Sequence, residues 1–448
     1  MSTTNSAANN SAPTLRKTLG VFDGVAILIG ITIGAGIFST PQLIAGYFSN
    51  FYTIISAWIF AGVFVFLGGL IYAELGTRLP NTGGEYVYLN RAFGPYVGFI
   101  FGWAQLFIIR TSPAAGLSII AVNYLGHFVE LSETMRIVAA LLIIATLGAF
   151  NYFGVKIASA YQKFSTIFKV AAVVFLVIVG ITTLSSGSVN LGETVQPTGE
   201  LGDLGNFAAA MMLIIFSFLG WDRVGYVAGE MKNPRRVIPM SMFIGITTVL
   251  VVYLLANLLY HQTLGMEGVR GSERLASDVA TLLLGGFGAA FLALAVVFST
   301  TGSTNGTTLT APRVYYAMAK DGLFFKWFDH IHPKFRTPSR AIIAHCAWAA
   351  VILLVRQNFQ SIVAGMTFAV LIFYAMTTLA LFKFRRENVG EADHYKMPLY
   401  PILPGIYFVA IVILIAIRAY YQWQASLADL AFIATGIPFA FYWCRKQK

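Results

Sequence analysis

The stretch GITIGAGIFST, residues 30–40, lies inside an apolar run that is otherwise long enough to cross a membrane as one helix. It contains three glycines, Gly30, Gly34 and Gly36. A glycine in a helix interior costs roughly 0.5–1 kcal/mol relative to alanine, so the stretch is poorly suited to a straight helix. It predicts a helix that comes apart at its centre.

The composition places the chain in a membrane. Of its 448 residues 57% are hydrophobic and 11% are charged, and this excess overrides the several soluble domains that the length alone would suggest. Apolar runs of about 20 residues, the length that spans the hydrocarbon layer, predict an all-α integral membrane protein with twelve transmembrane helices. The runs lie near residues 22–47, 51–78, 94–126, 134–152, 156–184, 204–231, 235–262, 285–315, 339–356, 359–384, 400–423 and 426–444.

The charges indicate an orientation. The chain has 30 Lys and Arg against 19 Asp and Glu, a net charge of +11. If both termini are cytoplasmic, most of the basic residues face the cytoplasm, as the positive-inside rule expects. The few on the outer side would be Arg136, Arg270, Arg274, Arg356 and Arg418. The basicity therefore predicts the topology, with both termini cytoplasmic, and nucleic-acid binding is not expected. We expect the chain to lie in the inner (cytoplasmic) membrane of a prokaryote.

Residues 1–14 are small and polar and are expected to form a disordered cytoplasmic tail, which leaves 15–448 as a single domain.

Other features argue against enzyme chemistry. The two cysteines, Cys346 and Cys444, allow no disulfide or CxxC-type metal site to be drawn. No HExxH, GxSxG or P-loop motif is present, so no enzyme activity, cofactor or metal is expected.

A second interruption matches the first. The sixth apolar run contains FSFLGWD, residues 216–222, where Gly220 weakens the helix and Asp222 can cap the N–H groups of a new one. Irregular backbone at membrane depth is tolerated only where it lines a cavity or is buried in protein. Paired interruptions at corresponding positions of two halves indicate a transporter site near the bilayer midplane.

The chemistry of the two breaks indicates a ligand. Opening the first run exposes backbone N–H groups at the positive end of a half-helix, which would hold a carboxylate. Opening the sixth run frees carbonyl groups, which suit an ammonium group. A ligand that carries both groups on one carbon is an α-amino acid. The alternative is that Gly34 and Gly36 only allow close helix packing, as small residues do in membranes.

Six motifs in order give the chain a family resemblance. They are GITIGAGIF, YAELGTRLPNTGGEYVYL, FIIRTSP, FSFLGWD, GEMKNPRRVIP and NGTTLTAPRVYYAMAKDGLF. Together they resemble the amino acid, polyamine and organocation (APC) superfamily, most closely its L-type amino acid transporter branch. The resemblance implies the leucine-transporter fold, with residues 22–184 and 204–384 as inverted repeats of five helices, 400–444 as two further helices, and the first and sixth helices unwound at their centres.

The same resemblance implies roles for residues at the breaks. The substrate carboxylate would meet the backbone N–H groups of Gly34, Ala35 and Gly36. The amino group would meet carbonyls of Thr32, Phe216 and Leu219, with Phe216 also acting as an aromatic gate and Trp221 packing behind the break. Mammalian members bind a helper subunit through a cysteine between the third and fourth helices. GHFVELSE, residues 126–133, has none, so no disulfide-linked partner is expected.

Two buried cations need explanation, because a charge at a helix centre costs roughly 2.5–3.5 kcal/mol on insertion scales. Arg110 precedes Pro113 in the third run; it could tie carbonyls freed by the proline or lie on the transport path. Lys169 lies near mid-membrane in the fifth run. It resembles the family lysine that replaces a sodium ion between the first and eighth helices. The hydroxyl-rich run Ser299–Thr304, with Ser299 and Ser303, would supply its oxygen partners.

We expect a secondary transporter of L-amino acids, with a neutral side chain favoured by the apolar surroundings of Leu219. Sodium-independent exchange is the first interpretation. The alternatives are proton-coupled symport, if Lys169 releases a proton on burial, an amine or polyamine carrier, for which Asp222 is the nearest carboxylate, and an amino acid sensor that moves nothing.

Overall fold

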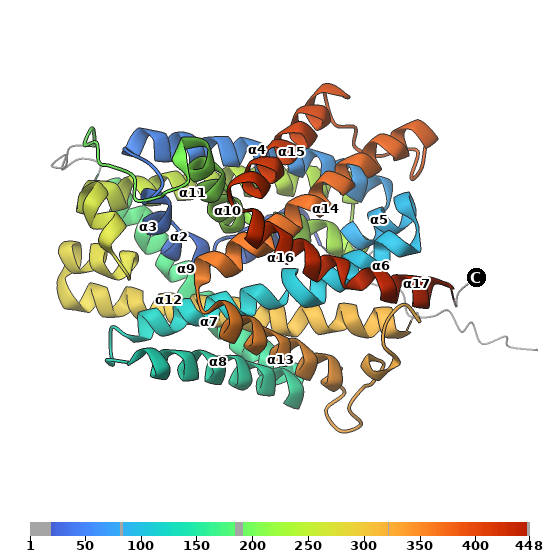
Figure 1. Cartoon of the computed structure of the whole chain (residues 1–448), viewed down its shortest axis with the longest axis horizontal. Helices are drawn as coiled ribbons and strands as arrows, with labels where there is room; N and C mark the ends of the chain where they lie inside the picture. The colour runs from blue at the N-terminus through green and yellow to red at the C-terminus, as the bar shows by residue number, and fades with distance from the viewer. Residues whose placement is uncertain (1–18, 81–83, 184–190, 321, 446–448) are drawn as a thin grey trace, which may run out of the picture.

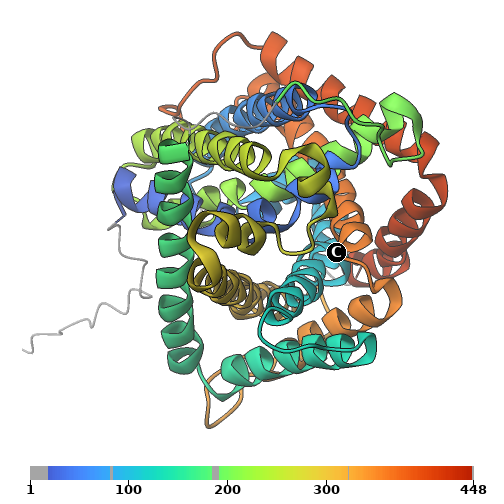
Figure 2. The same ribbon diagram turned by 90° about the vertical axis from the view of Figure 1, so that its left-hand side faces the viewer.

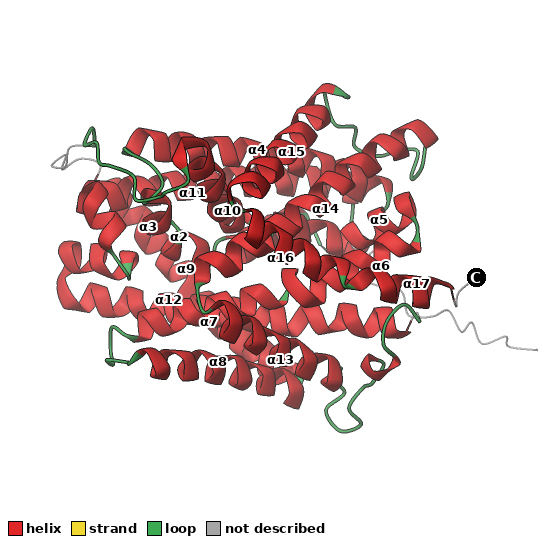
Figure 3. Cartoon of the chain, viewed as in Figure 1, coloured by secondary structure: helices red, strands yellow, loops and turns green. Residues whose placement is uncertain are grey.

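The computed structural model describes residues 19–80, 84–183, 191–320 and 322–445. Within these ranges every regular element is a helix, and strand-like pairing is limited to one isolated bridge between Leu19 and Met231 (Figure 3). Eleven helical segments of the described chain are long and apolar enough to cross a membrane. The prediction of an all-α chain is therefore confirmed there, while the predicted tail, residues 1–14, lies outside the described residues.

Most consecutive helices are joined by short connections (Figure 1). η1 is a π-helix, and η2 and η3 are 3₁₀ helices. In chain order the elements are α1 (Val21–Thr32), α2 (Ala35–Ser39), α3 (Pro41–Ala45), α4 (Phe51–Arg78), α5 (Glu85–Phe93), α6 (Pro95–Ala104), η1 (Gln105–Ile109), α7 (Thr111–Leu125), α8 (Glu133–Phe153), α9 (Val155–Thr183), α10 (Gly202–Phe218), η2 (Trp221–Glu230), α11 (Pro234–Gly271), α12 (Leu275–Lys320), η3 (Lys326–Phe328), α13 (Ser339–Arg356), α14 (Phe359–Glu387), α15 (Ile402–Tyr421), α16 (Trp423–Ala434) and α17 (Gly436–Arg445).

Two helices are longer than the sequence predicts. The expected segments 235–262 and 285–315 are parts of α11 and α12, which have 38 and 46 residues. Each is bent at a glycine with positive φ, Gly265 (67°) in α11 and Gly285 (70°) in α12, and continues as helix on the other side of the bend. Hydropathy marks only the part that lies in lipid, so it misses the portions beyond each bend.

The helices form two groups that face each other. One group contains α1, α4, η2 and α11, which pack against one another. The other contains α7, α8, α12 and α13. α9 contacts α11 and α12, and α14 contacts α4 and α7, so these two helices join the groups. α2, which follows the first interruption, contacts α12 and α7, and α10, which precedes the second, contacts α2 and α14. Both interruptions therefore adjoin helices that link the two groups.

The molecule has two ends along its long axis. The terminal end holds the C-terminal end of α17, together with the connection 388–401 between α14 and α15 (Figure 1). The opposite end, which we call the cavity end, holds the turns 272–274 and 357–358, and Figure 2 views the molecule from this side. Each end is held by a buried carboxylate that pairs with two arginines.

Glu74 is the carboxylate of the terminal end. It is fully buried near the end of α4 and receives two hydrogen bonds from Arg385, at 2.8 and 2.6 Å. Arg78 donates to it at 2.9 Å and the backbone N–H of Met397 at 2.8 Å. Bidentate pairing of arginine with a carboxylate is among the stronger polar contacts in proteins. Glu74 therefore fastens α14 and the connection 388–401 to α4.

Asp429 has the corresponding role at the cavity end. It is fully buried in α16, accepts from Arg418 Nη2 at 2.8 Å and also pairs with Arg356. Arg418, at the end of α15, is itself 2% exposed and lies over the ring of Phe368 at 4.3 Å. The contacts tie α13, α14, α15 and α16 together. They also explain two of the arginines that sequence analysis assigned to the sparsely charged side.

Candidate functional site

The first interruption separates α1 from α2. α1 ends at Thr32, Ile33 is extended (φ −72°, ψ 104°), and Gly34 is also outside the helical region (φ −151°, ψ −142°). Helix resumes at Ala35 and runs through Thr40, whose N–H donates to Gly36 O at 2.9 Å, into α3. Since the first N–H groups of a helix have no partner within it, the start of α2 presents donors here and the end of α1 presents acceptors.

The second interruption separates α10 from η2. α10 ends at Phe218, Leu219 is extended (ψ 136°), and Gly220 has a φ of 124°. That conformation strongly favours glycine because a side chain is strained there. The segment after the break is a 3₁₀ helix rather than the α-helix that the sequence predicts over 204–231.

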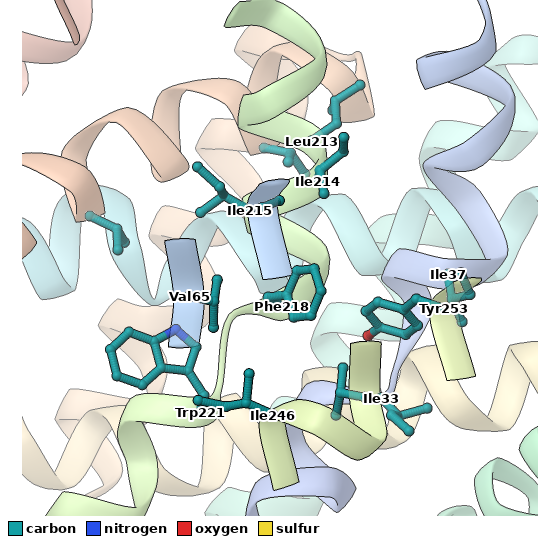
Figure 4. Packing of buried hydrophobic residues seen from close by; sticks show 14 of the residues in the cluster. Ile33, Ile37, Val65, Leu213, Ile214, Ile215, Phe218, Trp221, Ile246 and Tyr253 are labelled. Atoms are coloured by element: carbon teal, nitrogen blue, oxygen red, sulfur yellow. The ribbon is translucent and has the colours of Figure 1, made fainter. Parts of the chain in front are cut away.

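The two interruptions touch. A β-carbon on Gly220 would lie 2.7 Å from Ile31 Cγ2 and 3.2 Å from the backbone nitrogen of Thr32. A β-carbon on Gly36 would lie 2.7 Å from the Cα of Ser217. Figure 4 shows the apolar surroundings, with Ile33 and Ile37 on one side and Phe218 on the other. Glycines at both breaks therefore let the two backbones approach closely.

Lys169 reaches the first break from α9. Its Nζ donates to Gly30 O at 3.1 Å and to Ser303 Oγ at 3.0 Å, and the residue is 5% exposed. A β-carbon on Gly34 would lie 3.4 Å from Ser303 Oγ and 4.0 Å from Lys169 Nζ. The ammonium group thus joins α1, α9 and α12 beside the break. Ser299 takes no such part: its hydroxyl is buried without a hydrogen-bond partner.

Tyr253 of α11 spans both breaks, and sequence analysis missed it. Its hydroxyl lies 3.0 Å from the O atom of Thr32, the last residue of α1, and 2.7 Å from the O atom of Ser217, the second-last residue of α10. A hydroxyl has one proton, so it donates fully to one carbonyl at a time. The only sequence signal is a tyrosine in the middle of the apolar run, where a buried hydroxyl needs a partner.

The remaining residues expected at the breaks fall into two sets. The carbonyls of Thr32 and Phe216 lie at the breaks, and each already accepts one hydrogen bond, from Tyr253 and from the N–H of Leu219 at 2.9 Å. The ring of Phe216 is partly buried. Trp221 is 1% exposed and packs on two rings that belong to α4 and α14, those of Tyr72 (4.8 Å) and Tyr374 (5.3 Å). It therefore packs behind the break.

Arg110 follows a π-helical turn, which the sequence did not predict. The Nε of its guanidinium donates to Gln105 Oε1 at 2.7 Å, which belongs to a side chain rather than to the backbone. Carbonyls of the turn instead accept from Thr111 (2.7 Å), Tyr315 (3.2 Å) and Trp348 (2.7 Å). The π-turn, rather than the proline alone, thus creates the unpaired carbonyls, and neighbouring helices satisfy them.

Two buried carboxylates lie beyond the second break. Asp222 is 5% exposed and pairs with Arg223 at 3.4 Å. Glu85, in α5 and outside the candidate spans, is 4% exposed and accepts from Thr377 Oγ1 at 3.3 Å. Burial, and next the charge of Asp222, raise the pKa of the Glu85 carboxyl to about 8. Sequence analysis missed Glu85 because α5 is a short polar segment between two spans.

This arrangement of helices has known relatives. The amino acid permease family model matches residues 19–440. The chain belongs to the amino acid permease family. The resemblance to the APC superfamily is thereby confirmed, and the permease is a multi-pass membrane protein of a transporter family.

Individual relatives match nearly the whole permease. The serine/threonine exchanger SteT of Bacillus subtilis is 32% identical over 88% of this chain and 90% of its own. The b(0,+)-type amino acid transporter 1 of Mus musculus is 30% identical over 95% of this chain and 88% of its own. The human cystine/glutamate transporter is 26% identical over 97% of this chain and 87% of its own. These relatives are transporters by name.

Proposed function

We propose that the permease is a secondary transporter that exchanges neutral L-amino acids across the cytoplasmic membrane without using sodium. The observation that carries this proposal is the ammonium of Lys169 at 3.1 Å from Gly30 O and 3.0 Å from Ser303 Oγ, beside the first break. This ammonium group hydrogen-bonds to oxygen atoms that a sodium ion would need as ligands. A fixed cation here holds α1 to α12 with no ion gradient.

The substrate would lie between the two breaks. Its carboxylate would accept from the N–H groups of Gly34, Ala35 and Gly36, where no side chain larger than a methyl group blocks approach. Its ammonium group would donate to the carbonyls of Thr32, Phe216 and Leu219, each of which has a second lone pair available. Tyr253 would release one carbonyl as the substrate binds.

A neutral amino acid suits the surroundings better than a polyamine. Ile33, Leu219 and the neighbouring rings are apolar, and the nearest carboxylate, Asp222, already pairs with Arg223. A second ammonium group on the ligand would therefore lack a free anion. The name of one relative, a serine/threonine exchanger, supports both exchange and a neutral substrate.

We further propose twelve transmembrane helices, with α9 as the fifth. Residues 22–184 and 204–384 would be inverted repeats, and 400–444 two added helices, within one domain from residue 15 to 448. Both termini would be cytoplasmic, so that the terminal end faces the cytoplasm and the cavity end faces outward. No disulfide-linked helper subunit would be needed.

Exchange is tested in liposomes that contain the purified permease. Vesicles loaded with unlabelled serine should take up labelled serine at least tenfold faster than empty vesicles, with no response to sodium. Strong uptake into empty vesicles under an inward proton gradient would favour proton symport instead. Stabilisation by amino acids without any flux would identify a sensor, and stabilisation by polyamines alone would overturn the amino acid assignment.

A further inference from the structure

A cavity opens at the cavity end of the molecule. Its volume is about 510 Å³, and α2, α3, α7, α8 and the turns after α11 and α13 contribute to its wall. Phe359, the first residue of α14, is part of this wall. The residues behind Phe359 therefore form one boundary of the cavity.

The ring of Phe359 meets the ring of Phe216. The two centroids are 5.7 Å apart and the planes cross at 76°, an edge-to-face contact. Phe216 lies three residues before Leu219, where α10 stops being helical. Phe359 is 9% exposed, so one part of its ring faces the cavity while most of it is covered. The pair of rings thus links the cavity wall to the end of α10 at the second break.

The ring of Phe359 packs against Gly116 of α7. A β-carbon on Gly116 would lie 3.1 Å from Phe359 Cδ2 and 3.5 Å from Cε2. The first distance is shorter than ordinary contacts, so any larger residue would push the ring by a few tenths of an ångström. The position of the ring thus depends on the absence of a side chain on the facing helix.

The turn that carries Phe359 is held from both sides. Arg356 donates to Ser361 O at 2.7 Å and pairs with Asp429, which belongs to α16. The N-cap Asn358 accepts from the N–H of Ser361 at 3.1 Å. Gln360 hydrogen-bonds to the hydroxyl of Tyr47, which follows α3. A ring on such a braced turn is held in place, whereas Phe216 belongs to a helix that ends two residues later, at Phe218.

We propose that Phe359, seated on Gly116, is the fixed half of a two-ring lid with Phe216 and limits the size of the amino acid side chain that passes from the cavity to the breaks. The inference rests on the proposed transport function. Gly116 positions the ring of Phe359, and the ring sets the largest substrate side chain that can pass. Removal of the Phe359 ring should admit larger side chains, and a methyl group on Gly116 should exclude them.

The test compares Phe359→Ala, Gly116→Ala and the double variant with wild type in exchange assays, using serine and phenylalanine presented from the cavity side. Phe359→Ala should raise the phenylalanine-to-serine rate ratio at least fivefold, and Gly116→Ala should lower it at least threefold. The double variant should behave like Phe359→Ala, because the ring that Gly116→Ala displaces is gone. Phe287→Ala, at a phenylalanine that is 86% exposed, and Gly405→Ala, with no atom within 4 Å, are the controls.

Each outcome decides the inference. If wild type exchanges no amino acid, the proposed function fails and the lid fails with it. If wild type exchanges but both variants slow serine and phenylalanine equally, the residues are merely structural and the lid is overturned. Should Phe359→Ala not fold, Phe359→Leu removes the ring while keeping an apolar side chain, and an unchanged ratio in that variant would also overturn the lid.

Discussion

The two backbone breaks are held in different ways. Polar side chains from other helices hold the first: Lys169 bonds to Gly30 O and Tyr253 to Thr32 O. The second shares the Tyr253 hydroxyl, through Ser217 O, but its shape is also fixed by backbone geometry, with Gly220 at a φ of 124° and the buried ring of Trp221 behind it. The first break can therefore adjust by exchanging side-chain partners when a ligand arrives, whereas a change of shape at the second also requires its backbone dihedrals to change. The comparison predicts that substitutions at the two breaks fail in different ways.

The largest effect is expected where the breaks meet. Gly36→Val should abolish amino acid binding, because even the first added carbon would lie 2.7 Å from the Cα of Ser217 and would displace one break from the other. Valine is well tolerated in lipid, so insertion should persist. Binding is measured by ligand-induced thermal stabilisation, which reports ligands that bind the folded state alone. Wild-type affinity in a folded Gly36→Val protein would contradict the proposed site.

At the second break, Gly220→Ala should destabilise the whole fold. A residue with a side chain is strained at positive φ by about 1–3 kcal/mol, and the new methyl group would meet Ile31 Cγ2 at 2.7 Å. The apparent melting temperature in detergent should fall by several degrees even without ligand. Gly405→Ala, which meets no neighbouring atom within 4 Å, is the matched control and should melt as wild type does.

At the first break, Lys169→Ala should leave the fold intact but slow exchange by at least tenfold, because α1 loses its bond to α12. The rate of counterflow in loaded liposomes is the measurement, with and without sodium. Recovery of exchange by sodium in the variant would support the view that the ammonium occupies an ion position. Unchanged exchange would remove Lys169 from the mechanism.

A smaller change at the first break is expected for Tyr253→Phe. The loss of one hydrogen bond to a buried carbonyl costs about 1–3 kcal/mol, so substrate affinity should change by roughly fivefold or more, while the ring packing on Trp58 at 5.3 Å persists. Isothermal titration with serine measures the affinity. An identical affinity and an identical exchange rate would show that the hydroxyl does not couple the two breaks.

The smallest effect concerns pH, beyond the second break. Because the pKa of Glu85 is raised to about 8 by burial, the folded protein retains a proton that the unfolded chain loses above about 4.5. Its stability should therefore decline as pH rises from about 4.5 through about 8. Glu85→Gln keeps the shape without the charge and should flatten the dependence of melting temperature on pH over that interval. Equal slopes for the two proteins would contradict the assignment.

Sequence alone locates both breaks but not what holds them. Gly30–Gly36 and Gly220 stand out locally, because glycine and polar residues interrupt apolar runs, and the all-α architecture follows from the same runs. Contacts between distant residues leave no such trace. Tyr253 lies 221 residues from Thr32, and nothing in its neighbourhood distinguishes it from lipid-facing tyrosines.

Other features were hidden for related reasons. The π-turn before Arg110 arises where Tyr315 and Trp348 donate hydrogen bonds from other helices, so the residues of the turn itself contain no pattern that predicts it. The bends at Gly265 and Gly285 depend on φ values that apolar patterning cannot report. The predicted roles of Gly34, Ala35, Gly36, Leu219 and Lys169 in transport stay predictions until binding is measured.

The pairing of Asp429 also has a consequence for how the protein is made. During synthesis Arg356 leaves the ribosome 73 residues before Asp429, and Arg418 leaves it 11 residues before. Removing one partner from a buried ion pair costs about 3–5 kcal/mol, so both guanidinium groups remain uncompensated until α16 is inserted. The last helices thus complete the assembly of helices made much earlier. A substitution of Asp429 should therefore lower the amount of folded protein, because the unassembled chain is degraded after synthesis, rather than lower the transport rate of each molecule.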